Sequence, residues 1–545
     1  MTKTINPIRL EIIRNALISA AEEMGVAVRR TARSVTVREM RDFSTAIFDA
    51  QGRNIAQAAR IPVHLNTMSP CLQEVLENHL PAGDWEEGDV VVINDPYCGG
   101  QHLPDVIVYR PIFVDGALMG FSGVIAHQAD IGGGSPGSYN MKATEIFAEG
   151  LIIPPVKIRR RGVIVDDIIQ IIKRNVRQPD LLHDDLLSLI ASTDIGAKNI
   201  MRLADKFGAD VVQAATEMII DQSAAAMAKA IAELPDGRFE FADVIDDDGI
   251  EDRQHTVRVA VIIENGKLTI DFTGTDPQAK GLVNCTLNIT KSCIYYAVMA
   301  AIGDHIPPNS GCYSQINIVA PLGTLVNCAY PAPVVGRIVV GHRVANVIMG
   351  ALSKAMPDRI PAAYYGVSYV MTTAIGTGAR TKVYLDTEVG GWGGEPGKDG
   401  ANAFSAGLHN LSAIPIEMLE AVYPIRFRTY GLRPDSGGAG TYRGGLGLIR
   451  EWRLEADSAL FACAFDRTRS QPFGLHGGEP GSCTRVALVR GDGELVELGG
   501  KVVGVPVARG EGIRVETAGG GGFGPRAERT EELLSFDRRE GYVTQ

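Results

Sequence analysis

One β-hairpin has a register that can be counted directly from the sequence, and it constrains the fold more than any other feature. The segment DVIVYRPIFVDGALMGFSGVIAH (105–127) has two apolar-rich runs around an Asp-Gly pair at 115–116, a dipeptide typical of two-residue hairpin turns. Counting outward from this turn places Asp105 opposite Ala126. His127 then lies one residue further along, at the same open end of the hairpin.

The segment GGQHLPDV (99–106), just before the first strand, adds a second imidazole to this end. Pro104 disfavours a helix between His102 and Asp105, so their closeness depends on the chain's entry into the hairpin. The counted register puts His127 opposite Pro104, and we therefore expect His102, Asp105 and His127 to meet. A His-x-x-Asp pattern alone is also common in capped turns, which is the structural alternative.

A second predicted hairpin, DFSTAIFDAQGRNIAQA (42–58), turns within DAQG at 49–52. Its open end carries Asp42, opposite about residue 59, and the two hairpin ends could face each other. Two imidazoles and two carboxylates suit Zn²⁺, Mn²⁺ or Fe²⁺. Asp42, His102, Asp105 and His127 are the predicted metal ligands.

Other polar residues near these segments are expected to serve as caps, turn residues or hydrogen-bond partners of ligands: Glu39, His64, Asp95, Asp130 and Glu145. Cys98 and His102 form a weaker candidate pair for acyl transfer. The serine in GGGSPGS (132–138) lacks the strand–turn–helix setting of a hydrolase nucleophile. The sequence names no partner for His183 or His409.

Chain length, net charge and the distribution of apolar residues indicate the class of protein and its fold class. The 545 residues carry a net charge of −11, which argues against a nucleic-acid partner, and neither a signal sequence nor a long apolar run is present. We expect a cytoplasmic protein without a membrane partner. Its predicted fold class is α+β, multidomain, with mixed β-sheets and hairpins, a helical segment and a Gly-rich, β-rich C-terminal region.

Three domains are predicted: an α+β metal-site domain (1–235), a central α/β domain (236–420) and a β-rich domain (421–545). The first helix is expected to start at Pro7 with Asn6 as its cap. The 62 glycines gather in runs such as GGWGGEPG (390–397) and TAGGGGFG (517–524). These runs match neither a P-loop nor a dinucleotide fingerprint, and most are expected to be tight turns between strands.

Several longer blocks resemble the hydantoinase B / oxoprolinase family, which provides the B subunits of ATP-dependent cyclic amide hydrolases. These blocks are REMRDFSTAIFDAQGRNIAQAARIPVHLNTM, NDPYCGGQHLPDVIVYRPIF, EGLIIPPVKI and GLRPDSGGAGTYRGGLGLIREWR. The resemblance implies a partner A subunit of the hydantoinase A type, which binds ATP and phosphorylates the substrate, and a hetero-oligomeric complex. It also implies that His102, Asp105, His127 and Asp42 hold a divalent metal ion.

The activity implied by this resemblance is ring opening of a phosphorylated hydantoin, N-methylhydantoin or 5-oxoproline. The mechanism that we predict for it is attack by a metal-activated water, with Asp130 or Glu145 as the base. Two alternatives remain open. The family also contains large subunits of ATP-dependent ketone carboxylases, and the chain could instead be a non-catalytic scaffold for its A subunit.

Overall fold

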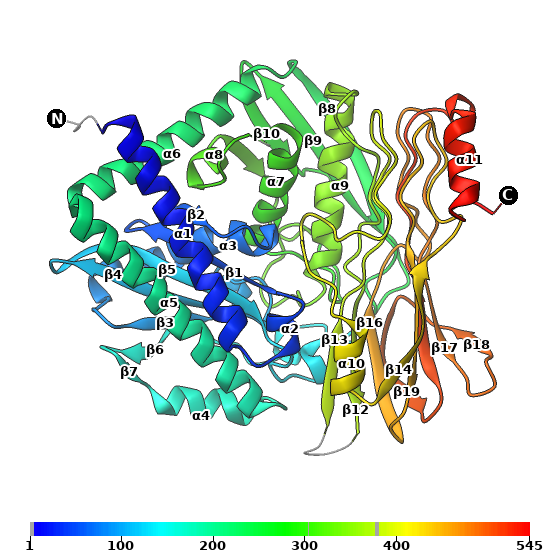
Figure 1. The fold of residues 1–545 in the computed structure, drawn as a ribbon, viewed down its shortest axis with the longest axis horizontal. Coiled ribbons are helices and arrows are strands. Elements are labelled where there is room, and N and C mark those ends of the chain that lie inside the picture. The colour runs from blue at the N-terminus through cyan, green and yellow to red at the C-terminus, as the bar shows by residue number, and fades with distance from the viewer. Residues whose placement is uncertain (1–4, 304, 377–380, 545) are drawn as a thin grey trace.

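A computed structural model describes residues 5–303, 305–376 and 381–544. Figure 1 shows the chain passing from an N-terminal sheet with long helices, through a central layer, to a C-terminal region of strands and extended loops. The fold is α+β with several separate sheets, as predicted. No helix within these ranges combines the length and apolarity needed to cross a bilayer.

The N-terminal sheet has seven strands in the order β2-β1-β5-β4-β3-β6-β7, and every neighbouring pair is antiparallel. The strands are β1 (Phe43–Asp49), β2 (Asn54–Gln57), β3 (Val90–Ile93), β4 (Asp105–Val114), β5 (Ala117–His127), β6 (Val156–Arg160) and β7 (Val163–Ile164). Both predicted hairpins, β1–β2 and β4–β5, are therefore present, and β1 joins them by pairing with β5.

Helices cover both faces of this sheet. Alternate residues of β1 face opposite sides, so Phe43 and Ile47 pack with α1 and α5, whereas Ala46 and Phe48 pack with α3. As predicted, α1 starts at Pro7, and the Asn6 side chain accepts the Ile8 N–H at 2.9 Å. The helices are α1 (Pro7–Thr31), α2 (Val35–Arg38), α3 (Pro62–Asn78), α4 (Asp166–Asn175), α5 (Pro179–Phe207) and α6 (Ala209–Ala232).

The central layer is a four-stranded sheet backed by apolar helices. Its order is β11-β10-β9-β8, with β10 and β11 parallel. Helix α9 packs on β8 and β9, and α7 lies between α9 and α3, which links this layer to the N-terminal sheet. The elements are β8 (Gly237–Ile245), β9 (His255–Glu264), β10 (Lys267–Asp271), β11 (Ile316–Val319), α7 (Leu287–Ile302), α8 (Ser310–Tyr313) and α9 (Arg337–Ala355).

Two further sheets form the C-terminal region, ordered β13-β12-β16-β19 and β14-β15-β20-β17-β18. Because β12 pairs with β16, one sheet spans the predicted boundary at residue 420, and the three-domain division stays a prediction. The elements are β12 (Val370–Ile375), β13 (Lys382–Asp386), β14 (Ile425–Leu432), β15 (Leu448–Leu454), β16 (Ser458–Ala464), β17 (Arg485–Val489), β18 (Leu495–Glu497), β19 (Lys501–Ala508), β20 (Gly512–Glu516), α10 (Ile416–Val422) and α11 (Glu531–Arg539).

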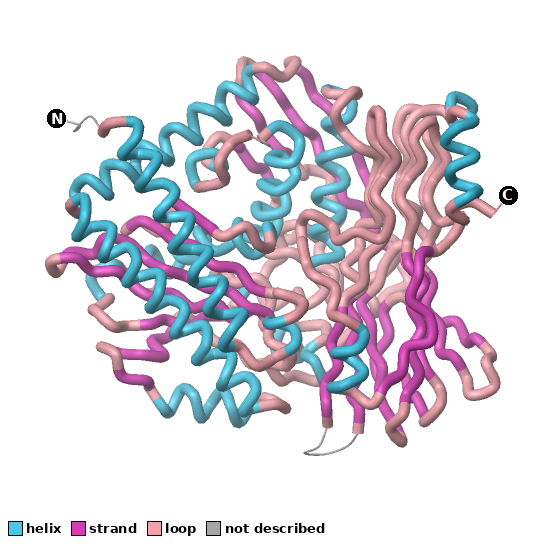
Figure 2. Tube along the Cα trace, viewed as in Figure 1, coloured by secondary structure: helices cyan, strands magenta, loops and turns pink. Residues whose placement is uncertain are grey.

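Many of the glycines expected in tight turns instead lie in extended segments that pack side by side. Figure 2 shows these loops running alongside one another next to α11. The segment 518–524 exchanges backbone hydrogen bonds with residues 363, 391–394, 438–445 and 475–479. A Cβ on Gly520 would lie 1.9 Å from the Trp392 carbonyl oxygen. We call these five segments the glycine bundle, in which only glycine lets backbones approach this closely.

Candidate metal centre

The β4–β5 hairpin pairs Asp105 directly with His127, not with Ala126 as the counted register predicts. The register shifts between Ile112 and Phe113, where a β-bulge leaves Met119 without a partner. Beyond the bulge every pair is displaced by one residue. The predicted pairing was therefore wrong by one position, and the actual register brings the carboxylate and the imidazole closer together.

The Asp105 carboxylate lies between two imidazoles. Its Oδ2 is 2.8 Å from His102 Nδ1, and its Oδ1 is 3.1 Å from His127 Nδ1. His102 and Asp105 are fully buried and His127 is 4% exposed. Upstream, Gly99 turns the chain with φ of 93°, and a Cβ there would lie 2.7 Å from the Cys71 Cα, so a side chain would block this turn.

The predicted approach of the two hairpin ends takes the form of strand pairing. Phe43 lies opposite Ala126, and the His127 N–H donates to the Asp42 carbonyl at 3.0 Å. His64, in the first turn of α3, has its Nε2 3.5 Å from Asp42 Oδ1 and 3.8 Å from Asp105 Oδ1. His64 was expected only as a supporting residue, yet it joins the cluster that Asp42, His102, Asp105 and His127 form.

A buried guanidinium also contacts the cluster. Arg337, the first residue of α9, donates from Nη2 to Asp105 Oδ2 at 2.6 Å and to Gln101 Oε1 at 3.1 Å. Burial alone would raise the pKa of Asp105, but His102 and Arg337 hold that pKa well below its usual range. Asp105 is therefore a carboxylate.

Burial is the largest cause of the pKa shifts of the other side chains in the cluster for which a shift is found. Burial and the nearby Arg337 charge lower the pKa of His102 well below its ordinary value, and burial lowers the pKa of His64. Burial raises the pKa of Asp42, against the attraction of His127 and His64. Neutral imidazoles beside a carboxylate are in the protonation states that metal ligands require.

The residues present fit a divalent cation. His102, Asp105 and His127 each offer a ligand atom within 4.8 Å of the others. Across the described ranges, nothing hydrogen-bonds to the buried His127 Nε2 or His64 Nδ1, which leaves two imidazole nitrogens without a partner. The cavity among these side chains measures about 20 Å³, enough for an ion or one water molecule.

The two predicted bases lie elsewhere. Asp130 accepts N–H groups from Gly132 at 3.0 Å, Gly137 at 3.0 Å and Arg177 at 2.9 Å, so its carboxylate holds a turn together. Glu145 is exposed, directly before a short 3₁₀ helix. Neither residue lines the cavity of the cluster. The contacts thus give Asp130 a structural part and lend no support to a catalytic role for Glu145.

The acyl-transfer pair also gains no support. The Cys98 thiol lies 3.5 Å from Asp95 Oδ2. Burial and this carboxylate raise the pKa of Cys98 to about 12, so the sulfur stays protonated and weakly nucleophilic at neutral pH.

Four titratable side chains of the cavity wall were not predicted as site residues or were expected only to support them: His64, Tyr139, Arg337 and His409. The Tyr139 hydroxyl lies 3.4 Å from His102 Nε2. Tyr139 follows the predicted loop 132–138, so its closeness in sequence was a usable signal. Arg337 and His409 come from segments more than 200 residues away from the hairpin, and no local pattern pointed to them.

A buried His/Asp cluster on a multi-sheet α+β scaffold is the class of site that this chain presents, and comparisons with known proteins place it in a family. Residues 6–526 match the family Hydantoinase B/oxoprolinase, and the chain belongs to this family. A protein of Pseudomonas sp. (strain NS671), provisionally assigned as the B subunit of a D-/L-hydantoinase, is 33% identical over 99% of this chain and 94% of its own length.

Two solved structures share the fold. The crystal structure of an ATP-dependent caprolactamase from Pseudomonas jessenii superposes with a TM-score of 0.91 at 28% identity, covering 99% of this chain and 95% of that chain. A nucleotide-free acetone carboxylase structure has a TM-score of 0.89 at 18% identity, covering 99% and 78%. At this lower identity the second match shows the fold alone.

Proposed function

We propose that this chain is the B subunit of an ATP-dependent cyclic amide hydrolase, which opens the ring of a substrate phosphorylated by a hydantoinase A-type partner. The observation that carries this proposal is the buried carboxylate of Asp105 between His102 and His127, in a chain that matches an ATP-dependent caprolactamase along 99% of its length. The complex is a hetero-oligomer, and we place it in the cytoplasm.

The metal ligands in this proposal are His102, Asp105, His127 and Asp42. A divalent ion such as Zn²⁺, Mn²⁺ or Fe²⁺ supplies Lewis acidity when bound, lowering the pKa of water or polarising a carbonyl. The protein's own part is to keep His102 neutral and Asp105 ionised, and to anchor Asp105 through Arg337. This anchoring leaves the carboxylate little freedom to rotate.

The division of labour with a partner rests on the family to which this chain belongs, and we assign ATP to the A subunit on that ground. The glycine runs are consistent with it, because they match neither a P-loop nor a dinucleotide fingerprint. Transfer of phosphate to the amide oxygen makes that oxygen a leaving group, and this chain then brings water to the activated carbon. Asp130 and Glu145 stay as predicted bases, without support from the site geometry.

The size of the cavity limits how the substrate can reach the cluster. About 20 Å³ accommodates an ion or a water molecule but not a five-membered ring. The cyclic amide therefore reaches the cluster only when part of the wall, formed by residues such as Thr387 and Leu411, is displaced.

The test uses the complex copurified with its A-type partner. We expect ATP-dependent opening of hydantoin, N-methylhydantoin or 5-oxoproline, and a divalent metal in elemental analysis. His102→Ala and His127→Ala should each lower the rate more than about 100-fold, while His183→Ala, on α5, should leave it unchanged. His183 is a matched control because it lies outside the cluster.

Other outcomes point to the alternatives. Bicarbonate-dependent carboxylation of ketones without ring opening would make the chain a carboxylase subunit. A metal-free complex whose turnover is unaffected by both histidine substitutions would make it a scaffold.

A further inference from the structure

A chain of hydrogen-bonding groups, all buried except the partly exposed His409, ends at the wall of the candidate metal cavity. His342 Nδ1 lies 2.8 Å from the Tyr364 hydroxyl, and His342 Nε2 lies 2.6 Å from Ser368 Oγ. The same Ser368 oxygen lies 2.8 Å from His409 Nδ1 and 3.3 Å from His409 Nε2. His409 shares its cavity with His64, His102, Asp105 and His127. These contacts link four side chains, Tyr364, His342, Ser368 and His409, which we call the relay.

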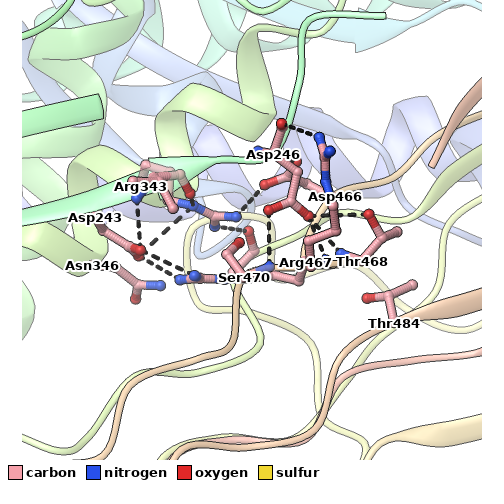
Figure 3. Close-up of polar contacts among 12 residues, drawn as sticks. Asp243, Asp246, Arg343, Asn346, Asp466, Arg467, Thr468, Ser470 and Thr484 are labelled. Carbon is pink, nitrogen blue, oxygen red and sulfur yellow. Dashed lines mark hydrogen bonds and ion pairs between the residues drawn. The ribbon is translucent and has the colours of Figure 1, made fainter. Parts of the chain in front are cut away.

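The relay is held by rigid neighbours. His342 lies on α9, the helix that begins with Arg337, and both His342 and Ser368 are buried. The next residue, Arg343, donates to the Gly366 carbonyl at 2.7 Å and to the Val244 carbonyl at 2.7 Å, and it pairs with Asp466. Figure 3 shows Arg343 within this buried network of charges. The segment 364–368 is thus held by the hydrogen bond from Arg343 to the Gly366 carbonyl.

We propose that His409 is the group that moves the proton between the attacking water and the departing ring nitrogen, with Ser368 and His342 as positioning residues that set its tautomer. The inference rests on the proposed hydrolase function and adds a catalytic residue that the sequence did not indicate. In this role His409 replaces the predicted bases Asp130 and Glu145, which lie outside the cavity.

The relay supports this role because its hydrogen bonds can run in two directions. Burial and the Arg343 charge lower the pKa of His342 to about 3, and burial lowers the pKa of His409 well below its usual value. Each neutral ring therefore has one donor and one acceptor nitrogen. Ser368 has a single hydroxyl proton, so it donates to one ring and accepts from the other.

The direction of the hydrogen bonds in the relay decides whether His409 Nε2 carries a proton or a free lone pair. When Tyr364 donates to His342, Ser368 donates to His409 Nδ1, and His409 Nε2 carries a proton. When the direction is reversed, His409 donates from Nδ1 to Ser368 and Nε2 has a free lone pair. The shorter distance of Ser368 to Nδ1 makes Nδ1 the relay atom and leaves Nε2 for the reaction.

The bonds and protons balance in the proposed step. The water oxygen bonds to the activated carbon, the C=N π electrons move to the ring nitrogen, and one water proton passes through His409 Nε2 to that nitrogen. The C–N bond then breaks with its electron pair going to the nitrogen, and the remaining hydroxyl proton passes to that nitrogen by the same Nε2. The products are an amine and an acyl phosphate, whose phosphate leaves when a second water attacks the carbonyl carbon. Arg337, Asp105, His64 and His342 are the charged or titratable groups that act on His409.

The experiment uses the copurified complex with the cyclic amide that it opens. His409→Ala should lower kcat by about 100-fold or more, in the range of general acid–base catalysis, with KM within two-fold of wild type. Imidazole in solution should restore part of kcat, and substituted imidazoles should restore it in the order of their pKa. Ser368→Ala should lower kcat about 10-fold, and Ser368→Thr, which keeps the hydroxyl, should recover most of it.

His255→Gln is the matched control, because His255 is a fully buried histidine that contacts Arg253, away from the cavity. It should leave kcat unchanged. Metal content and copurification with the partner should be the same in all variants. A wild-type complex that opens the ring while His409→Ala keeps kcat within two-fold would overturn the inference alone. A wild-type complex that opens no cyclic amide would overturn the proposed function and the inference with it.

Discussion

At the scale of single residues, one buried carboxyl connects the loop after β5 to the candidate metal centre without lining its cavity. Glu149 is fully buried, and its Oε1 accepts the Val335 N–H at 2.8 Å, just before α9 begins at Arg337. Among the described residues its Oε2 has no hydrogen-bond partner. Burial raises the pKa of Glu149 to about 8, and the backbone N–H groups offset only part of this effect.

The raised pKa of Glu149 predicts a pH-dependent stability. A carboxyl with an ordinary pKa of 4.5 and a folded pKa of about 8 stabilises the fold most below pH 4.5. That contribution is lost as the pH rises to about 8, because the unfolded chain releases the proton first. Glu149→Gln removes this loss, which is on the order of 5 kcal/mol.

We therefore expect Glu149→Gln to raise the thermal midpoint relative to wild type at pH 9 by several degrees more than at pH 5. Glu145→Gln, at an exposed glutamate in the same loop, is the control and should show the same difference at both pH values. Equal effects of Glu149→Gln at pH 5 and pH 9 would contradict the prediction.

At the scale of elements, the glycine bundle replaces side-chain packing with backbone packing. Its central segment, 518–524, bonds to neighbours on several sides, for example from Gly394 N–H to the Gly521 carbonyl at 2.8 Å and from Gly522 N–H to the Glu479 carbonyl at 2.8 Å. Glycines in such extended segments have room for each other only without a Cβ, as in other close-packed extended chains.

Gly520→Ala should therefore be severely destabilising, by at least about 3 kcal/mol. The added Cβ would lie 1.9 Å from the Trp392 carbonyl oxygen and 2.2 Å from the Trp392 carbonyl carbon. Because both are backbone atoms, they cannot move away by a side-chain rotation. Gly431→Ala on β14 is the matched control, since nothing lies within 4 Å of a Cβ there, and it should change stability by less than about 0.5 kcal/mol. Chemical denaturation of both variants beside wild type measures the difference. Similar midpoints for the two would refute the role of close backbone packing.

Elements with local signals were predictable from the sequence, and the details set by packing were not. The α1 start, both hairpins and the Asp-Gly turn followed from caps and turn residues, and that turn has the expected positive φ at Asp115 and Gly116. The counted register missed by one because it took no account of the bulge at Met119, although Gly120 beside it is an interior strand glycine of the kind that often marks a bulge. The glycine bundle was misjudged because extended and turn glycines look alike in sequence.

At the scale of the whole molecule, the difference between local sequence signals and long-range packing explains which site residues could be predicted. His102, Asp105 and His127 lie within one hairpin and its entry, so their meeting could be predicted. Arg337 and His409 reach the site because the start of α9 and the loop that carries His409 contact N-terminal residues, as in the hydrogen bonds from Arg337 to Asp105 and from the Val63 N–H to the Leu408 carbonyl, and these contacts join distant segments. Such contacts have no sequence period, and only the fold reveals them.

A network of buried charges holds those distant parts together. Arg467, fully buried, donates to Asp243 Oδ1 on β8 at 3.0 Å. Asp466 beside it pairs with Arg343 of α9 and accepts from Lys501 of β19 at 3.0 Å. Figure 3 shows Arg467, Asp243 and Asp466 converging from the central and C-terminal elements. The network therefore joins two parts of the chain that the predicted boundary at residue 420 separates.

Arg467→Met leaves the largely buried Asp243 carboxylate with only the longer contact to Arg343 Nε at 3.7 Å. Because an under-compensated buried charge is costly, the substitution should destabilise the protein by about 3 kcal/mol. Arg469→Met, two residues away, is the matched control. Arg469 pairs with Asp252 at 2.6 Å and also donates to the Asp246 carbonyl, but the Arg469 and Asp252 side chains are 47% and 84% exposed, and such exposed pairs contribute at most about 1 kcal/mol. Denaturant unfolding of the two variants and wild type compares their losses in the free energy of unfolding. If Arg467→Met also carries Asp243→Leu, which removes the stranded carboxylate, part of the lost stability should return. Equal small effects of Arg467→Met and Arg469→Met would show that the network does not hold the central and C-terminal parts together.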